Sequence, residues 1–176
     1  MRDIRLCDER DLTSILAIVN DAAVAYRGVI PADRWHEPYM PAAELRSEIA
    51  AGVEFWGLET DKGLIGVMGV QPVRDVDLIR HAYVRPDSQR LGVGAALIEH
   101  LRGRATRRML VGTWATASWA ISFYQRHGFE LVAPPRASAL LRAYWTIPER
   151  QIDTSVVLAH PPLRECGGAP PAPMRT

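Results

Sequence analysis

Residues 84–94 constrain this chain most, because they read Val-Arg-Pro-Asp-Ser-Gln-Arg-Leu-Gly-Val-Gly and predict a strand that turns into a helix. Gly92 and Gly94 fall where the helix is expected to begin, and two alanines follow them. The first amides of a helix have no partner inside the helix, and the helix dipole places partial positive charge there. Glycines let a ligand approach such amides closely. The segment therefore predicts a cradle for a phosphate-bearing ligand.

Two common phosphate-binding loops do not match this segment. A nucleotide P-loop ends in Gly-Lys-Ser or Gly-Lys-Thr, whereas two alanines follow Gly94 here. The dinucleotide fingerprint follows its strand directly and needs Gly or Ala where Leu97 stands. The remaining pattern, Gln-x-x-Gly-x-Gly after a strand ending in Tyr83 and Val84, resembles the acetyl-coenzyme A loop of the GNAT N-acetyltransferases. The alternative is a glycine-rich helix start that serves only the path of the chain.

A second segment, residues 120–129, carries the same resemblance. It reads Ala-Ile-Ser-Phe-Tyr-Gln-Arg-His-Gly-Phe and is similar to the family pattern Ala-Ile-x-Phe-Tyr-x-x-x-Gly-Phe. Family members often place Asn or Asp just before this helix, whereas this chain leaves Thr116 or Ser118 to cap it. Residues 140–151 look like those of one bacterial GNAT subgroup. Altogether the resemblance covers residues 4–159.

Length and composition set further bounds. The 176 residues are expected to form one GNAT domain at 1–160 and a disordered, Pro/Gly-rich tail at 161–176. With 21 basic and 20 acidic residues the net charge is +1, which argues against a nucleic-acid partner. Cys7 and Cys166 have no metal-binding spacing and predict no disulfide framework. Because no apolar run is long enough for a membrane span or a signal peptide, we expect a cytoplasmic protein with no membrane partner.

Hydrophobic periodicity and turn residues predict the order of strands and helices. Strands are expected at 4–6, 54–59, 64–70, 77–84, 109–114, 130–132 and 155–159. Helices are expected from Asp8 to about Tyr26, from Pro41 with Leu45 and Ile49 as its apolar residues, after Gly94, at 118–127 and around 140–144. This order predicts an α/β (α+β) fold, a mixed, twisted sheet with helices on both faces. The resemblance implies the same architecture, the GNAT acyl-CoA N-acyltransferase fold.

The resemblance also implies where acetyl-coenzyme A binds. In the family, two parallel strands splay apart and pantetheine lies between them, which corresponds here to residues 77–84 and 109–114. The backbone of Ala82 and Val84 would pair with pantetheine beside Tyr83, and the N–H of Ala82 would stabilise the oxyanion. The diphosphate would lie on the turn formed by Gln89, Arg90, Leu91, Gly92, Val93, Gly94 and Ala95. No metal ion is expected.

Tyr124 is the predicted general acid. It matches the family tyrosine that faces the thioester sulfur, where a phenol can protonate the departing thiolate. The alternative is that Phe123 and Tyr124 both pack on the apolar side of an amphipathic helix.

The sequence indicates the general base less clearly than the general acid. Many family members carry a glutamate near the middle of the strand before the loop, where Leu78 stands here. Histidine titrates near neutral pH, so we predict His81 as the base, on the strand face opposite Arg80 unless a bulge exchanges the faces. The alternatives are a hydrogen-bonding role for His81, an ordered water, or a base from the loop at 31–40, which resembles the family's substrate lid and contributes His36 and Glu37.

Aromatic side chains are the expected walls of the acceptor pocket. The residues predicted to bind the acceptor are Tyr26, Trp35, His36, Glu37 and Trp114, with Tyr39, Trp119 and Trp145 as further wall residues. The resemblance thus implies an N-acetyltransferase that moves the acetyl group of acetyl-coenzyme A to a primary amine of a small molecule or peptide, with a homodimer as one option. The alternatives are a non-catalytic acyl-coenzyme A sensor and a partner-binding domain.

Overall fold

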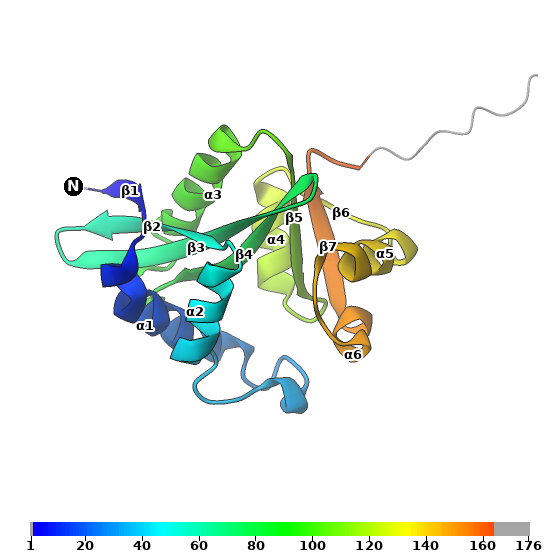
Figure 1. Ribbon diagram of the computed structural model, residues 1–176, viewed down its shortest axis with the longest axis horizontal. Helices are drawn as coiled ribbons and strands as arrows, with labels where there is room; N and C mark the ends of the chain where they lie inside the picture. Colours follow the sequence, from blue (N-terminus) through cyan, green and yellow to red (C-terminus); the bar gives the residue numbers. More distant parts are fainter. Residues whose placement is uncertain (1, 164–176) are drawn as a thin grey trace, which may run out of the picture.

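The computed structural model describes residues 2–163, so most of the expected tail, with Cys166, lies outside the described residues. Within them, one seven-stranded sheet contains β1 (Asp3–Leu6), β2 (Glu54–Thr60), β3 (Gly63–Val73), β4 (Val76–Val84), β5 (Arg108–Trp114), β6 (Glu130–Leu131) and β7 (Ser155–His160). The strand order is β1-β2-β3-β4-β5-β7-β6, and neighbours are antiparallel except β4 and β5, which are parallel (Figure 1). The predicted mixed sheet is confirmed.

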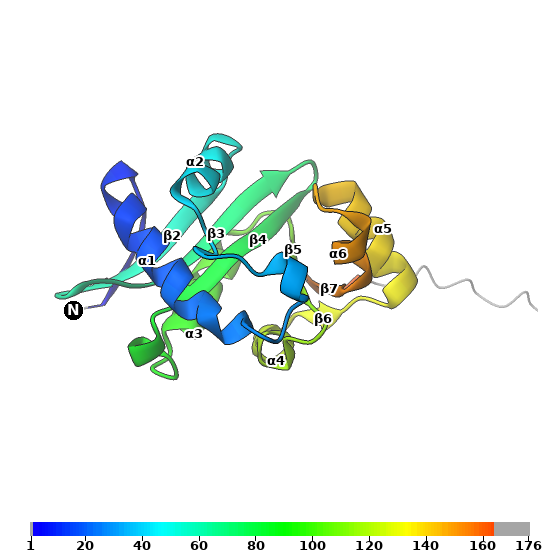
Figure 2. The same cartoon turned by 90° about the horizontal axis from the view of Figure 1, so that it is seen from below.

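Helices cover both faces of this sheet. Figure 2 shows α1 (Leu12–Ala23), α2 (Ala42–Ala50), α5 (Pro134–Tyr144) and α6 (Glu149–Asp153) on one side, and α3 (Val93–Arg104) and α4 (Ser118–Arg126) on the other. Side chains alternate along a strand, so adjacent residues of β4 enter different cores. Ile79 packs in the cluster that contains Leu97 of α3, whereas Leu78 packs in the cluster that contains Leu141 of α5. Both faces of β4 are therefore buried in its first half.

The structure corrects several predicted helix boundaries. Helix α5 begins at Pro134 rather than near 140, because proline suits the first position of a helix, and α6 follows it as a separate helix that we did not predict. Pro41 is the residue before α2 rather than its first residue. Neither Thr116 nor Ser118 caps α4 through its side chain, since Ala117 is the N-cap and the Thr116 hydroxyl donates to the Val29 carbonyl at 3.0 Å.

Candidate active site

The sheet opens between β4 and β5. These parallel strands pair from Val76–Arg108 to Ile79–Val111, and in the part of the chain that the structure describes their pairing ends there. Both strands continue, β4 to Val84 and β5 to Trp114, so their second halves diverge. The splayed pair that the family resemblance implied is present, with a gap in the sheet where main-chain groups of β4 have no strand partner.

The register of β4 against β3 identifies which main-chain groups face this gap. Tyr83 pairs with Val67, and the Arg85 amide donates to the Ile65 carbonyl at 2.9 Å. Hydrogen-bonding direction alternates along an antiparallel strand, so the groups of Tyr83 face β3 and those of Ala82 and Val84 face the gap. A main-chain role in binding pantetheine thus fits Ala82 and Val84, whereas the backbone of Tyr83 is already paired within the sheet.

The glycine turn places free amides at the start of α3. Gly92 has a φ of 80° and is the N-cap of α3, which has no side-chain cap, and Arg90 has a φ of 62°. The first intrahelical bond runs from the Ala96 amide to the Gly92 carbonyl at 2.9 Å, so the preceding amides of the first turn, Val93 to Ala95, have no partner within the helix. This cradle fits a diphosphate, because the amides stand at the positive end of the helix dipole.

Neighbouring small residues let this cradle form. A side chain at Gly66 of β3 would lie 2.5 Å from the Val93 side chain, so glycine there permits α3 to start close to the sheet. A Cβ at Gly94 would lie 3.2 Å from the ring of Phe123 in α4. Leu91 differs from the other predicted loop residues, since it is 53% exposed and lies outside the cavity wall, with its carbonyl bonded to Arg2 at 2.9 Å.

One cavity of about 840 Å³ joins this cradle to the gap between β4 and β5. Its wall includes residues that pack on opposite faces of the sheet, such as Phe123 in the core under α3 and Tyr39 in the core under α1. From the loop, Gln89, Arg90, Gly92, Val93, Gly94 and Ala95 line it. A ligand held on the cradle can therefore extend through the sheet toward the side of α1 and α2.

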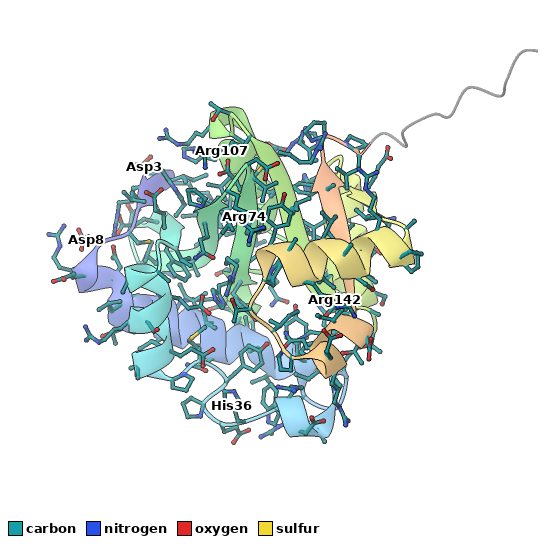
Figure 3. All side chains as sticks on the ribbon, turned by 45° about the vertical axis from the view of Figure 1, so that its right-hand side comes forward. Asp3, Asp8, His36, Arg74, Arg107 and Arg142 are labelled. Atoms are coloured by element: carbon teal, nitrogen blue, oxygen red, sulfur yellow. The ribbon has the colours of Figure 1, made fainter. Side chains whose placement is uncertain are left out.

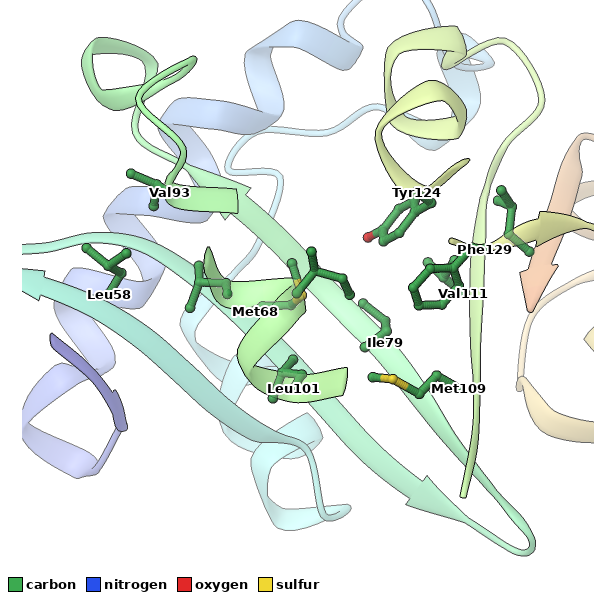
Figure 4. Close-up of a cluster of buried hydrophobic side chains, with 12 residues drawn as sticks. Leu58, Met68, Ile79, Val93, Leu101, Met109, Val111, Tyr124 and Phe129 are labelled. Atoms are coloured by element: carbon green, nitrogen blue, oxygen red, sulfur yellow. The ribbon is translucent and has the colours of Figure 1, made fainter. Parts of the chain in front are cut away.

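Tyr124 lines the same cavity from α4. Its ring is buried between Phe123 and Phe129, with centroid distances of 5.1 Å and 5.5 Å, and Figure 4 shows its hydroxyl end turned away from Phe129 and Val111. Burial raises the pKa of Tyr124 well above the usual range of a phenol, which keeps the hydroxyl protonated. Packing and proton donation are therefore compatible, because the ring is part of the core while the residue still reaches the cavity.

A bulge in β4 places His81 and Arg80 on the same face of the sheet. Pairing shifts by one residue between Val67 and Gly69 of β3, and His81 takes a left-handed φ of 51°. We expected the two side chains on opposite faces unless a bulge intervened, and the bulge turns both toward α2. Gly69 makes room for it, since a Cβ there would lie 2.9 Å from the Arg80 carbonyl.

Glu48 of α2 receives both of these side chains. His81 Nε2 forms a short hydrogen bond with Glu48 Oε2, and Arg80 Nη2 lies 3.2 Å from Glu48 Oε1. Burial by itself raises the pKa of Glu48, but the hydrogen bond to His81 and the charges of His81 and Arg80 outweigh it and lower that pKa overall. The carboxylate that we did not find on β4 is thus supplied from another element.

The sequence did contain a weak signal for Glu48. It lies three residues after Leu45, on the side of the helix that carries this buried leucine. We expected Ile49 to complete the apolar side, but Ile49 is 39% exposed and Glu48 is turned inward. An inward-facing carboxylate on a short helix indicates a specific partner, although the sequence does not show which one.

Aromatic rings gather on the α1 side of the gap. Tyr26 lies 6.3 Å from Tyr39 and 5.4 Å from Trp119 between ring centroids, and Tyr39 lies 6.5 Å from Tyr83. These four residues line the cavity together with Trp114 and Trp145. The prediction of an aromatic acceptor region is thus consistent with the geometry for Tyr26 and Trp114.

The structure does not bring Trp35, His36 and Glu37 to the cavity wall. His36 Nδ1 is bonded to the Pro38 carbonyl at 2.8 Å, and Figure 3 shows His36 at the outer edge of the loop between α1 and α2. Glu37 forms an ion pair with Arg27, which also lies 5.4 Å from the ring centroid of Trp35. Trp35 stands behind Tyr39, at 5.5 Å, so these residues support the wall from outside.

Two kinds of feature are absent from the described residues, a metal-binding cluster and a membrane-spanning helix. No group of three or more His, Cys, Asp or Glu side chains among them is arranged to hold a metal ion. None of their helices has the length and apolar character needed to cross a membrane.

Comparisons with known proteins agree with this geometry. The family described as acetyltransferase (GNAT) domain matches residues 51–131, which include the bulge, the glycine turn and Tyr124. The peptidyl-lysine N-acetyltransferase YiaC of Escherichia coli K12 is 27% identical over 129 residues, 73% of this chain and 84% of YiaC. These two matches support membership of the chain in the GNAT family of acetyltransferases.

Solved structures share its fold. The ribosomal-protein-alanine N-acetyltransferase of Brucella melitensis is 26% identical, with a TM-score of 0.57 over 74% of this chain and 86% of that one. The PaiA N-acetyltransferase of Thermoplasma acidophilum, solved in complex with coenzyme A, is 17% identical, with a TM-score of 0.65 over 90% of this chain and 98% of that one.

Proposed function

We propose that this protein transfers the acetyl group of acetyl-coenzyme A directly to a primary amine of a small molecule or peptide. The observation that carries the proposal is the single cavity that runs from the free amides of the glycine turn, through the gap between β4 and β5, to Tyr124 and His81. The coenzyme A complex of the Thermoplasma relative supports the choice of donor. The names of YiaC and of the Brucella relative, which act on protein amines, support a peptide among the acceptors.

Each step of the transfer has a group on this chain that suits it. Acetyl-coenzyme A, when bound, supplies the acetyl group as a thioester. The amides of residues 92–95 would hold its diphosphate, and the N–H of Ala82 would stabilise negative charge on the carbonyl oxygen. His81 would take a proton from the amine. The Tyr124 hydroxyl would give a proton to the sulfur, and the raised pKa of Tyr124 keeps this hydroxyl protonated until then.

Direct transfer is favoured over an acetyl-enzyme because of the position of Cys7. Cys7 is the only cysteine among the described residues. It packs against the core under α1 and does not line the cavity. Burial raises the pKa of its thiol to about 12, so the thiolate needed for nucleophilic attack is scarce at neutral pH. A cytoplasmic location and a homodimer stay predictions.

The test has two parts. Calorimetry with acetyl-coenzyme A should give saturable binding, and thiol release should appear when phenethylamine, a lysine peptide or a peptide with N-terminal alanine is added. Binding without thiol release from any amine would favour the acyl-coenzyme A sensor. Absence of binding would overturn the proposal and favour a domain that has lost the ligand.

A further inference from the structure

The structure points to a role for Glu48 beyond packing: we propose that it is the positioning residue that holds His81 as the general base. This inference rests on the proposed acetyl transfer and adds the residue that prepares the base. Glu48 lies in α2, 33 residues before His81 in sequence. It belongs neither to the glycine turn nor to the Tyr124 segment.

The contacts around His81 fix the ring from several sides. The side chains of His81 and Glu48 are 14% and 18% exposed, so their hydrogen bond is largely shielded from water. The His81 ring also stacks on Phe55 of β2, with centroids 5.8 Å apart and an interplanar angle of 20°. The left-handed backbone of the bulge orients His81 toward α2 at a conformational cost that this surrounding packing offsets.

Arg80 holds the other side of the Glu48 carboxylate. Its guanidinium lies 3.2 Å from Glu48 Oε1 and donates at 3.0 Å to the Gln71 side chain, whose amide is bonded to the Ala51 carbonyl at the end of α2. The charged groups in these contacts with His81 are therefore Glu48 from α2 and Arg80 from β4, while Phe55 of β2 and Gln71 of β3 are neutral. Arg80 keeps Glu48 ionised and in place.

This arrangement selects one tautomer of His81. An ionised carboxylate can only accept a hydrogen bond, so neutral His81 must carry its proton on Nε2, which faces Glu48. Nδ1 is then the nitrogen with the lone pair, on a residue that lines the cavity. When Nδ1 takes a proton, the resulting positive charge lies beside the Glu48 carboxylate, which stabilises it.

In the balanced reaction, His81 takes part in one step, the deprotonation of the acceptor ammonium. An acceptor ammonium loses one proton to His81 Nδ1, which later passes it to solvent. The free amine nitrogen bonds to the carbonyl carbon of the thioester, the carbon–sulfur bond breaks, and the sulfur takes a proton from Tyr124. The nitrogen loses its second proton to solvent and Tyr124 regains one from solvent, so the products are an amide, a thiol and one released proton.

The substitution Glu48→Gln tests this role, with Glu44→Gln as the matched control on an exposed position of the same helix. An amide can offer either its oxygen or its NH₂ group to the ring, so Glu48→Gln no longer dictates the tautomer. Nitrogen-15 NMR of His81 in the free protein should report the Nε2–H tautomer in the original chain and in Glu44→Gln, and a mixture in Glu48→Gln.

Turnover provides the second readout. With saturating acetyl-coenzyme A and the most active of the three amines, Glu48→Gln should lower kcat/KM about 10- to 100-fold and move its acidic limb to lower pH, with unchanged affinity for acetyl-coenzyme A. An unchanged tautomer or an unmoved acidic limb would overturn the proposal. If the original chain binds acetyl-coenzyme A but releases no thiol with any amine, the proposed function fails, whereas loss of activity without a tautomer change limits Glu48 to a structural role.

Discussion

The two ends of the cavity are built in different ways. At the loop end, the wall comes from a single short segment, residues 88–90 and 92–95. At the acceptor end, the lining residues come from α1 and the segment after it, from β4 and β5 and from α4, and they are far apart in sequence. Backbone groups need only the right local path, so the loop end depends on glycines, whereas the acceptor end depends on which side chains the fold brings together.

Tyr124 stands between the two ends and should give the largest effect. Tyr124→Phe removes the proton donor and keeps the ring in its core, so kcat should fall about 10²- to 10⁴-fold while the dissociation constant of acetyl-coenzyme A stays unchanged. Steady-state kinetics and calorimetry measure the two quantities. Tyr144→Phe is the control, since its hydroxyl bonds to Asp75 outside the cavity, and unchanged turnover in Tyr124→Phe would contradict a catalytic role.

The pH dependence of the same step follows from the direction of the pKa shift. Burial raises the pKa of Tyr124, so the donor form is present at all pH values below an unperturbed phenol's pKa of about 10. The rate should therefore not fall on the basic side, up to about pH 10, through ionisation of this tyrosine. A basic limb near pH 8 that disappears in Tyr124→Phe would contradict this assignment.

Gly92→Ala tests the loop end, with a smaller effect expected. Its φ of 80° is unfavourable for alanine by about 1 to 2 kcal/mol, which should shift the loop and weaken acetyl-coenzyme A binding about tenfold. Gly63→Ala is a matched control, because Gly63 has a φ of 92° in the β2–β3 hairpin, away from the cavity. Equal binding by both variants in calorimetry would show that the amides of residues 92–95 do not hold the diphosphate.

The same contrast explains what the sequence predicted and what it did not. The order of strands and helices along the chain and the glycine turn follow from local patterns, whereas the opening between β4 and β5 was expected only from the family resemblance. The structure contains all three. The partnership of Glu48 with His81 depends on a bulge and on the docking angle of α2, which no local pattern encodes. The prediction for Trp35, His36 and Glu37 rests on their chemistry and on the resemblance of their loop to the family's substrate lid, but the loop carries them outside the cavity wall.

Trp119→Ala tests the acceptor end. Trp119 is an exposed aromatic residue that lines the cavity beside Tyr26, and an aromatic contact contributes about 0.5 to 1.5 kcal/mol. The KM for the amine should therefore rise about 2- to 10-fold, with the affinity for acetyl-coenzyme A unchanged. Leu131→Ala is the control, because Leu131 is similarly exposed on β6. An increase in the acetyl-coenzyme A dissociation constant instead would place Trp119 at the donor end.

The smallest effect is expected from Gly103→Ala, near the C-terminal end of α3. Gly103 lies in the helix, and a Cβ there would meet nothing within 4 Å, so alanine should raise the free energy of unfolding by about 0.5 to 1 kcal/mol. The identical change at Gly94, in the first turn of the same helix, places a Cβ 3.2 Å from Phe123 and should stabilise less or destabilise. Urea denaturation of both variants compares a glycine packed beside the cavity with one whose surroundings are open. Equal stabilisation would mean that Gly94, like Gly103, is free of packing constraint, and the argument for a glycine-dependent loop end would then rest on Gly92 alone.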